Sequence, residues 1–308
     1  MSRFPGGKRF AFTIFDDTDH ATVENISPVY QFLTELGFRT TKSVWPLPTA
    51  FQDTSSGATL ADREYMQLIK MLDSDGFEIA LHNVRASDSP REVVRDGLKQ
   101  FASCLGHLPR IHCNHYNNRD NLYWGEDRLS FRAHRLVYRA GTLFRRKGCF
   151  QGHVNGSAYF WGDLCQEQIT YVRNFVFHEI NLDRINPTMP YHNPAMPYVN
   201  YWFSSCEGGN VHSFCDTINE ANQDRLMEQE GVCIMYAHFA SGFCTDGVLN
   251  QRFEQLMRRL AAKDGWFVPV ATLLDHLRTG RAQHDIPRRE LATMERRWLK
   301  QKFRRGTS

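Results

Sequence analysis

Two adjacent carboxylates, Asp16 and Asp17, directly follow the apolar run Phe10–Phe15. Negative charges this close raise one another's proton affinity, so the pair is costly unless one carboxylate binds a cation. A metal-dependent hydrolase needs such a division, because one group holds the metal while another accepts protons. Taken alone, an acidic turn that caps the next helix is the commoner explanation. The pair therefore indicates metal-assisted hydrolysis only if further ligands accompany it.

Histidines occur at the ends of three other apolar runs. His82, His238 and the neighbours His112 and His115 each follow a separate strand-like segment. Imidazole and carboxylate groups are usual ligands of first-row metals, and catalytic zinc sites combine three protein ligands with a water. One histidine at a strand end is usually structural. Three such ends, together with the aspartate pair, predict a metal site.

These side chains need a scaffold that brings several strand ends together. Strand-like runs and helical patterns alternate along the whole chain, without an internal repeat or a low-complexity linker. The predicted strands are Phe10–Phe15, Arg39–Trp45, Phe77–Leu81, Arg110–Cys113, Cys149–Val154, Tyr171–Phe177, Tyr198–Phe203, Gly231–Ala237 and Phe267–Val270. We therefore expect an α/β fold, a single-domain distorted (β/α) barrel of about seven or eight mostly parallel strands, with the functional loops at the C-terminal strand ends.

The helices between these strands are predicted from apolar residues at 3.6-residue spacing. Pro28–Leu36 is expected to begin through Ser27 and a first-turn proline. The other clear candidates are Leu60–Leu72, Pro90–Cys104 and Leu249–Ala262. Gly37, Gly76 and Gly106 each follow a helix, where a left-handed C-cap favours glycine.

Composition indicates a globular protein. The 308 residues are 42% apolar and 13% aromatic, which suffices for a sizeable core. Apolar runs such as Val232–Ala237 are too short to cross a bilayer, and residues 1–8 contain no apolar stretch of signal-peptide length. The eight cysteines form no C-x-x-C pair, so we expect reduced thiols. These features predict a cytoplasmic protein without a transmembrane segment.

Charge is distributed unevenly along the chain. The net charge is +3, but the stretch from Arg278 to the end carries ten Lys and Arg residues against three Asp and Glu. We expect a barrel domain over residues 1–278 and a basic helical tail over 279–308. The tail could touch a membrane surface, although a solvated terminal helix is the more usual explanation. No nucleic-acid partner is expected.

Several motifs together resemble the polysaccharide deacetylases of the carbohydrate esterase type. Thr13–Asp17 is similar to their T-F-D-D motif, with one extra residue after the threonine. Gly76–Asn83 matches a G-x-E-I strand and the first histidine of their H-[ST]-x-x-H motif. Ile234–His238 resembles their late strand that ends in histidine, and Gly265–Leu277 resembles the end of their domain. The resemblance covers roughly residues 8–278 and implies a distorted (β/α) barrel that removes acetyl groups from sugars.

The resemblance also implies roles for individual residues. Asp16 would be the general base, Asp17 and His82 metal ligands, and His238 the general acid. The second histidine of the H-[ST]-x-x-H motif is missing, because Ala86 stands at its position. We expect His115 to complete the metal triad instead.

Other residues are weaker candidates for the same site. His112 is the alternative third ligand, and Asn83 a less suitable one. Asp19 either orients a ligand and contacts the substrate or simply forms a turn. Trp124 and Trp202 are expected to bind sugar faces, unless they are core residues.

These expectations combine into one predicted activity. The chain should be a metal-dependent hydrolase, with zinc as the favoured metal, that deacetylates an N-acetylated sugar. A nucleotide-linked or lipid-linked sugar from surface-polysaccharide or O-antigen synthesis fits a cytoplasmic location. One alternative is an amidohydrolase that acts on a small non-sugar amide. The other is a metal-free carbohydrate-binding protein of the same fold, which the missing histidine would explain.

Overall fold

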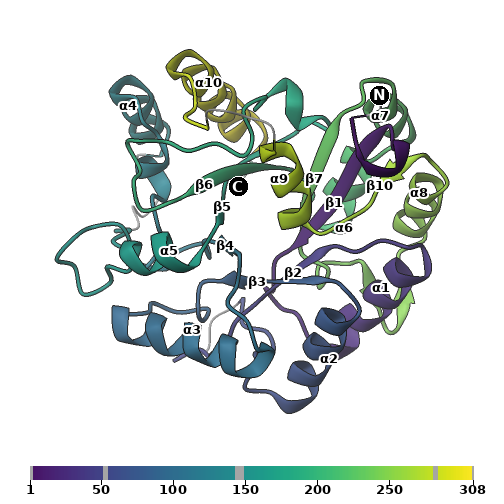
Figure 1. Ribbon diagram of the computed structural model, residues 1–308, viewed down its shortest axis with the longest axis horizontal. Coiled ribbons are helices and arrows are strands. Elements are labelled where there is room, and N and C mark those ends of the chain that lie inside the picture. Colours follow the sequence, from purple (N-terminus) through teal and green to yellow (C-terminus); the bar gives the residue numbers. More distant parts are fainter. Residues whose placement is uncertain (1–2, 51–54, 143–148, 280–283, 307–308) are drawn as a thin grey trace.

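Seven parallel strands close into a barrel (Figure 1). Each strand from β1 to β6 pairs with its successor, and β7 pairs with β1 to close the ring. The barrel strands are β1 Phe10–Asp16, β2 Thr41–Val44, β3 Glu78–His82, β4 Ile111–Cys113, β5 Tyr171–Phe177, β6 Tyr201–Cys206 and β7 Val232–Ala237. A further short strand, β10 (Gly265–Trp266), pairs with the beginning of β1. The computed structural model describes residues 3–50, 55–142, 149–279 and 284–306.

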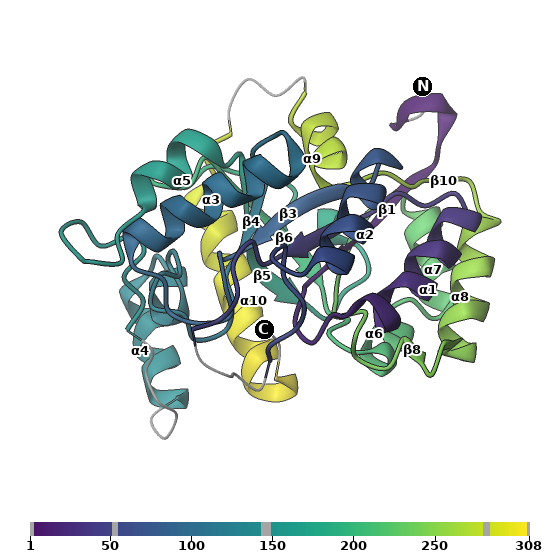
Figure 2. The same cartoon turned by 90° about the horizontal axis from the view of Figure 1, so that it is seen from below.

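Helices surround the barrel (Figures 1 and 2). The α-helices are α1 Val23–Glu35, α2 Arg63–Ser74, α3 Arg91–Leu105, α4 Arg132–Gly141, α5 Gly162–Gln168, α6 Val211–Thr217, α7 Glu220–Glu228, α8 Gln251–Ala261, α9 Val270–Arg278 and α10 Arg288–Arg305. The smaller elements are the 3₁₀ turns η1 Pro5–Gly7, η2 Gly125–Arg128 and η3 Leu182–Arg184 and the hairpin strands β8 Cys244–Thr245 and β9 Val248–Leu249. The expected single-domain distorted (β/α) barrel is confirmed.

Strand pairing aligns the strand ends that carry polar residues. Strands β1, β2, β4, β5 and β7 are buried along their whole length, as parallel strands between a filled barrel interior and a helical layer must be. Asp16 in β1 lies beside Ala237 in β7, and His82 in β3 lies beside Cys113 in β4. The residues that follow these strands therefore share one edge of the barrel.

Two of the predicted strands are wrong. The segment Cys149–Val154 is a loop. It contains Gly152, where an added Cβ would lie 2.1 Å from the carbonyl oxygen of Asp120, so this backbone approach admits only glycine. The segment Phe267–Val270 is not a strand either, because Pro269 cannot donate to a ladder and instead precedes α9.

The start of α1 also differs from the prediction. The helix begins earlier than Pro28–Leu36, at Val23, because Thr22 caps it and forms a reciprocal capping box with Asn25 of its first turn. Pro28 lies inside the helix. The three predicted C-terminal glycines are confirmed, since all have positive φ: Gly37 (79°), Gly76 (87°) and Gly106 (80°).

The basic tail forms a packed helix. Helix α10 lies against α4 and β5 (Figure 2). Trp298 of α10 is fully buried, with its ring centroid 5.2 Å from that of Phe175 in β5. No helix in the described ranges has both the length and the apolar character needed to cross a bilayer.

Candidate metal centre

One carboxylate, Asp19, lies among three imidazole rings at the C-terminal edge of the barrel. Asp19 Oδ2 lies 3.1 Å from His82 Nε2 and 3.3 Å from His238 Nε2. Asp19 Oδ1 lies 3.1 Å from His115 Nε2. Burial alone would raise the pKa of Asp19, but the imidazoles lower it well below its usual value. Barrel closure thus brings the ends of β1, β3, β4 and β7 to one point.

The ring of His115 is oriented by Asn118. The Asn118 amide donates to the backbone carbonyls of Arg85 (3.0 Å) and Ser87 (3.1 Å). Its Oδ1 must therefore accept the remaining bond, which comes from His115 Nδ1 at 3.0 Å. With the proton on Nδ1, the lone pair of His115 Nε2 faces Asp19.

The ring of His82 is oriented by a thiol. Its Nδ1 lies 2.7 Å from Cys113 Sγ, which in turn lies 3.6 Å from Asp17 Oδ1 and from the carbonyl oxygen of Leu81. Burial raises the pKa of Cys113 well above its usual value, so the group is a thiol at neutral pH. The S–H can donate to either oxygen while the sulfur accepts from His82 Nδ1. The lone pair of His82 Nε2 is then also directed at Asp19.

The third imidazole, His238, is held differently. Its Nδ1 donates to the carbonyl of Gly209 (2.8 Å), and the Tyr236 hydroxyl lies 3.3 Å from its Nε2. Burial would lower the pKa of His238, but Asp19 and Asp17 raise it to about 9. At neutral pH this ring is an imidazolium, which can donate a proton.

Asp17 forms a bidentate ion pair inside the barrel. Arg173 Nη1 and Nη2 lie 2.7 and 2.6 Å from the two oxygens of Asp17. The guanidinium also lies over the rings of Tyr236 (4.6 Å) and Phe15 (5.0 Å). Burial would raise the pKa of Asp17, but Arg173 and the nearby histidines lower it. The carboxylate is therefore ionised at neutral pH.

Asp16 lies on the opposite side of β1 and contacts the helical layer. Successive residues of a strand alternate between its two faces, so Asp16 and Asp17 cannot both point into the barrel. Asp16 Oδ2 lies 2.9 Å from Lys42 Nζ and accepts from the Tyr30 hydroxyl (3.0 Å), while Oδ1 accepts from the Phe239 amide (2.8 Å). Both charged side chains are fully buried. Asp16 therefore does not face the three histidines, and its role as general base stays a prediction.

The cluster offers donor sets that suit a divalent metal. Three groups bring their ligand atoms within 4.8 Å of one another: Asp19 with His82 and His115, Asp17 with His82 and Cys113, and Asp17 with Asp19 and His238. Asp19 Oδ2 and His82 Nε2 are buried without a hydrogen-bond partner of proper geometry, which a shared cation would supply. The combination expected from the sequence, Asp17 with His82 and His115, is not among these groups.

Three other expected residues do not join the cluster. His112 is buried, its Nε2 lies 3.1 Å from Asn114 Oδ1, and burial lowers its pKa to about 3. Trp202 is only 1% exposed and belongs to the core, so it offers no sugar-binding face. Trp124 is half-buried, and the guanidinium of Arg128 lies over one face of its ring at 3.8 Å, so its role in sugar binding stays a prediction.

Three residues of the cluster have roles that the sequence analysis missed. Asp19 was expected at its periphery but lies at its centre, while Arg173 and Cys113 were not singled out. The two-residue spacing between Asp17 and Asp19 was an available signal, because residues two apart near a strand end tend to face the same side. No comparable signal marks Arg173 or Cys113, whose partners are distant in the sequence.

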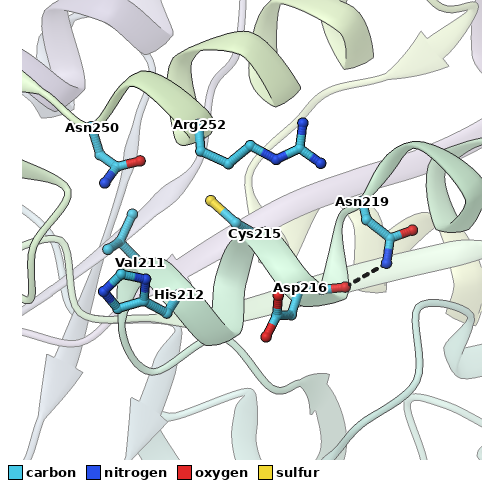
Figure 3. A pocket seen from close by; sticks show the side chains of 7 residues that line it. All are labelled: Val211, His212, Cys215, Asp216, Asn219, Asn250 and Arg252. Carbon is cyan, nitrogen blue, oxygen red and sulfur yellow. Dashed lines mark hydrogen bonds between the residues drawn. The ribbon is translucent and has the colours of Figure 1, made fainter.

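A separate cavity lies outside the barrel, between α6, α7 and α8 (Figure 3). Its volume is about 350 Å³, and its lining includes His212, Cys215, Asp216 and Arg252. Burial raises the pKa of Cys215 to about 11, so no thiolate is available there at neutral pH. Among the lining residues, Asn219 donates to the backbone carbonyl of Asp216 (2.8 Å). None of the strand-end histidines lines this cavity.

Solved structures with the same fold include proteins assigned as polysaccharide deacetylases. One, from Mycobacterium smegmatis, aligns with a TM-score of 0.54 and 11% identity over 92% of this chain and 96% of its own. Another, from Pseudomonas aeruginosa, gives 0.52 and 12% over 91% and 94%. The PuuE allantoinase gives 0.52 and 11% over 91% and 93%. No protein-family model and no curated protein matches the sequence. At these identities the likeness establishes the fold.

Proposed function

We propose that this protein is a metal-dependent hydrolase that removes the acetyl group from an N-acetylated sugar. The convergence of three imidazole Nε2 atoms on Asp19 carries this proposal. His82 and His115 have their Nδ1 atoms engaged by outer partners, so both can offer lone pairs toward one cation. We assign the metal to Asp19, His82 and His115. Two imidazoles and one carboxylate form a usual catalytic zinc set, and zinc is the favoured metal.

The proposed chemistry uses Asp17 and His238 for proton transfer. A metal bound at this site would supply Lewis acidity, lowering the pKa of a water and polarising the acetyl carbonyl. Asp17, kept ionised by Arg173, accepts the proton of the attacking water. His238, protonated at neutral pH, donates a proton to the leaving nitrogen, which is a poor leaving group without one. Asp17 thus takes the base role that the sequence analysis gave to Asp16, and Asp19 takes the ligand role that it gave to Asp17.

The substrate class rests on two lines of support. The motif order resembles that of the polysaccharide deacetylases, and two proteins assigned to that activity share the fold. A cytoplasmic location is supported by the eight unpaired cysteines, of which Cys206 and Cys233 lie 3.5 Å apart as thiols. A nucleotide-linked or lipid-linked N-acetyl sugar is therefore the proposed substrate.

A second candidate is hydrolysis of a small non-sugar amide. It is supported by the allantoinase, which has the same fold at a TM-score close to those of the deacetylase structures. The same carboxylates and histidines would serve this reaction, because both reactions cleave an amide through water attack. Only the substrate pocket would differ.

Metal analysis and product assays test the proposal together. Protein purified without chelators should contain close to one equivalent of zinc or another first-row metal, and Asp19→Ala and His115→Ala should abolish its retention. His107→Ala is the control, because His107 is largely exposed and lies away from the cluster. Incubation with UDP-N-acetylhexosamines should release acetate, whereas an amidohydrolase would release ammonia from simple amides.

Two results would refute the proposal. Metal below about a tenth of an equivalent in wild-type protein would leave a binding protein as the better account. Full metal retention by His115→Ala would show that this residue is not a ligand.

A further inference from the structure

Helix α10 carries an uninterrupted basic face. Arg289, Arg296, Lys300 and Arg304 follow one another at spacings of seven, four and four residues, which places them along one side of the helix over about 22 Å. All four are exposed. None of them forms an ion pair with another residue in the part of the chain that the structure describes. Their charges are therefore available to a partner.

The acidic residues of α10 point away from this face. Glu290 accepts from the backbone amide and the hydroxyl of Thr188 (3.0 and 2.7 Å). Glu295 is fully buried and lies 2.6 Å from the Ser130 amide and 2.6 Å from His134 Nδ1. The helix sequence contains no other acidic residue. Nothing on α10 therefore neutralises its outer side.

Exposed apolar side chains border the basic face. Val137 of α4 is 51% exposed, and Phe303 of α10 is 43% exposed. The Phe303 ring packs against Gly141, where a Cβ would lie only 2.2 Å away. Because Val137 and Gly141 are four residues apart, they lie on the same side of α4. Val137 and Phe303 thus lie close together where the two helices meet.

This surface lies at the edge of the barrel that holds the metal centre. The amide of His178, which follows β5, donates to Gln301 of α10 (2.8 Å), and Arg297 pairs with the neighbouring Glu179 (2.5 Å). The second half of α10 is therefore level with the C-terminal end of β5. Figure 2 shows α4 and the last turns of α10 on the same side of the barrel.

We propose that these two helices dock on the surface of an anionic phospholipid bilayer. The docking face consists of Arg289, Arg296, Lys300, Arg304, Val137 and Phe303. The basic residues match the negative potential of such a surface, and the apolar residues gain by entering its interfacial layer. A nucleic acid would pair with the basic residues but would leave the apolar side chains in water.

Docking does not depend on the proposed reaction, but the position of the docking face affects how a substrate would reach the metal centre. A bilayer against this face would lie beside the edge of the barrel where Asp19 and the three histidines meet. If the substrate is an acetylated sugar, a lipid-linked one would then reach the site without leaving the membrane. This step rests on the proposed function, whereas docking itself is tested separately.

Vesicle flotation of the full chain tests the docking. Vesicles of phosphatidylcholine with about one quarter phosphatidylglycerol should bind the protein, vesicles of phosphatidylcholine alone should not, and added salt should weaken binding. Each basic residue removed should lower the partition coefficient roughly fivefold, so that charge reversal of all four lowers it by several hundredfold or more. The variant is Arg289→Glu with Arg296→Glu, Lys300→Glu and Arg304→Glu.

A matched control separates this surface from net charge. The control changes the exposed basic residues of α2 and α3 by the same amount: Arg63→Glu, Lys70→Glu, Arg95→Glu and Lys99→Glu. It should retain most of the binding. Val137→Ser should weaken binding without changing its salt dependence. The proposal would be overturned if both charge variants lost binding equally, or if the wild type bound neither vesicle type or both equally. Preferential binding of an RNA oligonucleotide over anionic vesicles would also overturn it.

Discussion

Replacing Asp16 with asparagine should lower the free energy of unfolding without removing a catalytic group. Lys42 Nζ is fully buried, and Asp16 is its carboxylate partner at 2.9 Å, with the Asp17 carbonyl as a weaker acceptor at 3.4 Å. Burial would lower the pKa of Lys42, but Asp16 raises it, so the lysine stays charged. Asp16→Asn therefore leaves a charge buried without a carboxylate. Removing one member of such a pair typically costs about 3–5 kcal/mol of the free energy of unfolding.

The loss should be largely recovered when both charges are removed. Asp16→Asn combined with Lys42→Met replaces the pair with neutral groups of similar size, and such replacements are often neutral or stabilising. Urea unfolding of the wild type, both single variants and the double variant gives the coupling free energy directly. Metal content and turnover should be measured on the same preparations under folding conditions.

The two candidate roles of Asp16 predict opposite results in this experiment. Under the structural role, Asp16→Asn is strongly destabilised, but its folded fraction keeps its metal and a substantial part of its turnover. A variant that keeps its stability to within about 1 kcal/mol and its full metal content, yet loses turnover by several orders of magnitude, would refute the reasoning. Asp16 would then be the general base after all.

Three further predictions follow from the contacts of the cluster and of a buried carboxylate beside it. Cys113→Ala should weaken metal affinity about 10- to 100-fold in a chelator-competition titration, because the hydrogen-bond partner of His82 Nδ1 is lost. Cys113→Ser should lose less metal affinity. Unchanged affinity in both variants would show that the thiol does not orient the ring of His82. Arg173→Met should raise the pKa of Asp17, because the cation that lowers it is removed. The acid limb of the profile of kcat/KM against pH should then move to higher pH. An unmoved limb would mean that Asp17 is not the general base. Burial raises the pKa of Asp120 to about 6, so the native state binds more protons than the unfolded state between about pH 4 and 6. The contribution of this carboxyl to the free energy of unfolding should be complete below about pH 4, and the free energy should fall by about 3 kcal/mol as the pH rises through 6. Urea titrations across pH should show this slope, and Asp120→Asn should flatten it.

Much of the architecture was predictable because local patterns determine it. Strand β5 coincides with the predicted Tyr171–Phe177, and the glycines after three helices have the left-handed conformation that the chain reversal needs. The segment Cys149–Val154 was mistaken for a strand, because local apolar character does not reveal that Gly152 is pressed against another part of the backbone. Such a close approach is set by tertiary packing alone.

The site was predictable only in part. The sequence indicated that His82, His115 and His238 follow strands whose ends should meet, and all three lie around Asp19. The sequence did not show which aspartate lies nearest the histidines, because a motif with one extra residue does not reveal which carboxylate is on which face of the strand. The partner of Asp17 could not be inferred at all, since Arg173 comes from a strand more than 150 residues later.

The proposed metal would also stabilise the fold, because its ligands come from different strands of the barrel. Asp19 follows β1, His82 is the last residue of β3 and His115 follows β4, so the three do not belong to one short loop. An ion held by all three would cross-link the ends of β1, β3 and β4. Its binding free energy would add to the stability of the folded barrel, because the unfolded chain holds no preformed site. This arrangement would also explain why the site needs no histidine at the position of Ala86. With the second imidazole supplied by the neighbouring strand, the metal would tie β3 to β4 and hold the barrel wall together at the edge where the chemistry occurs.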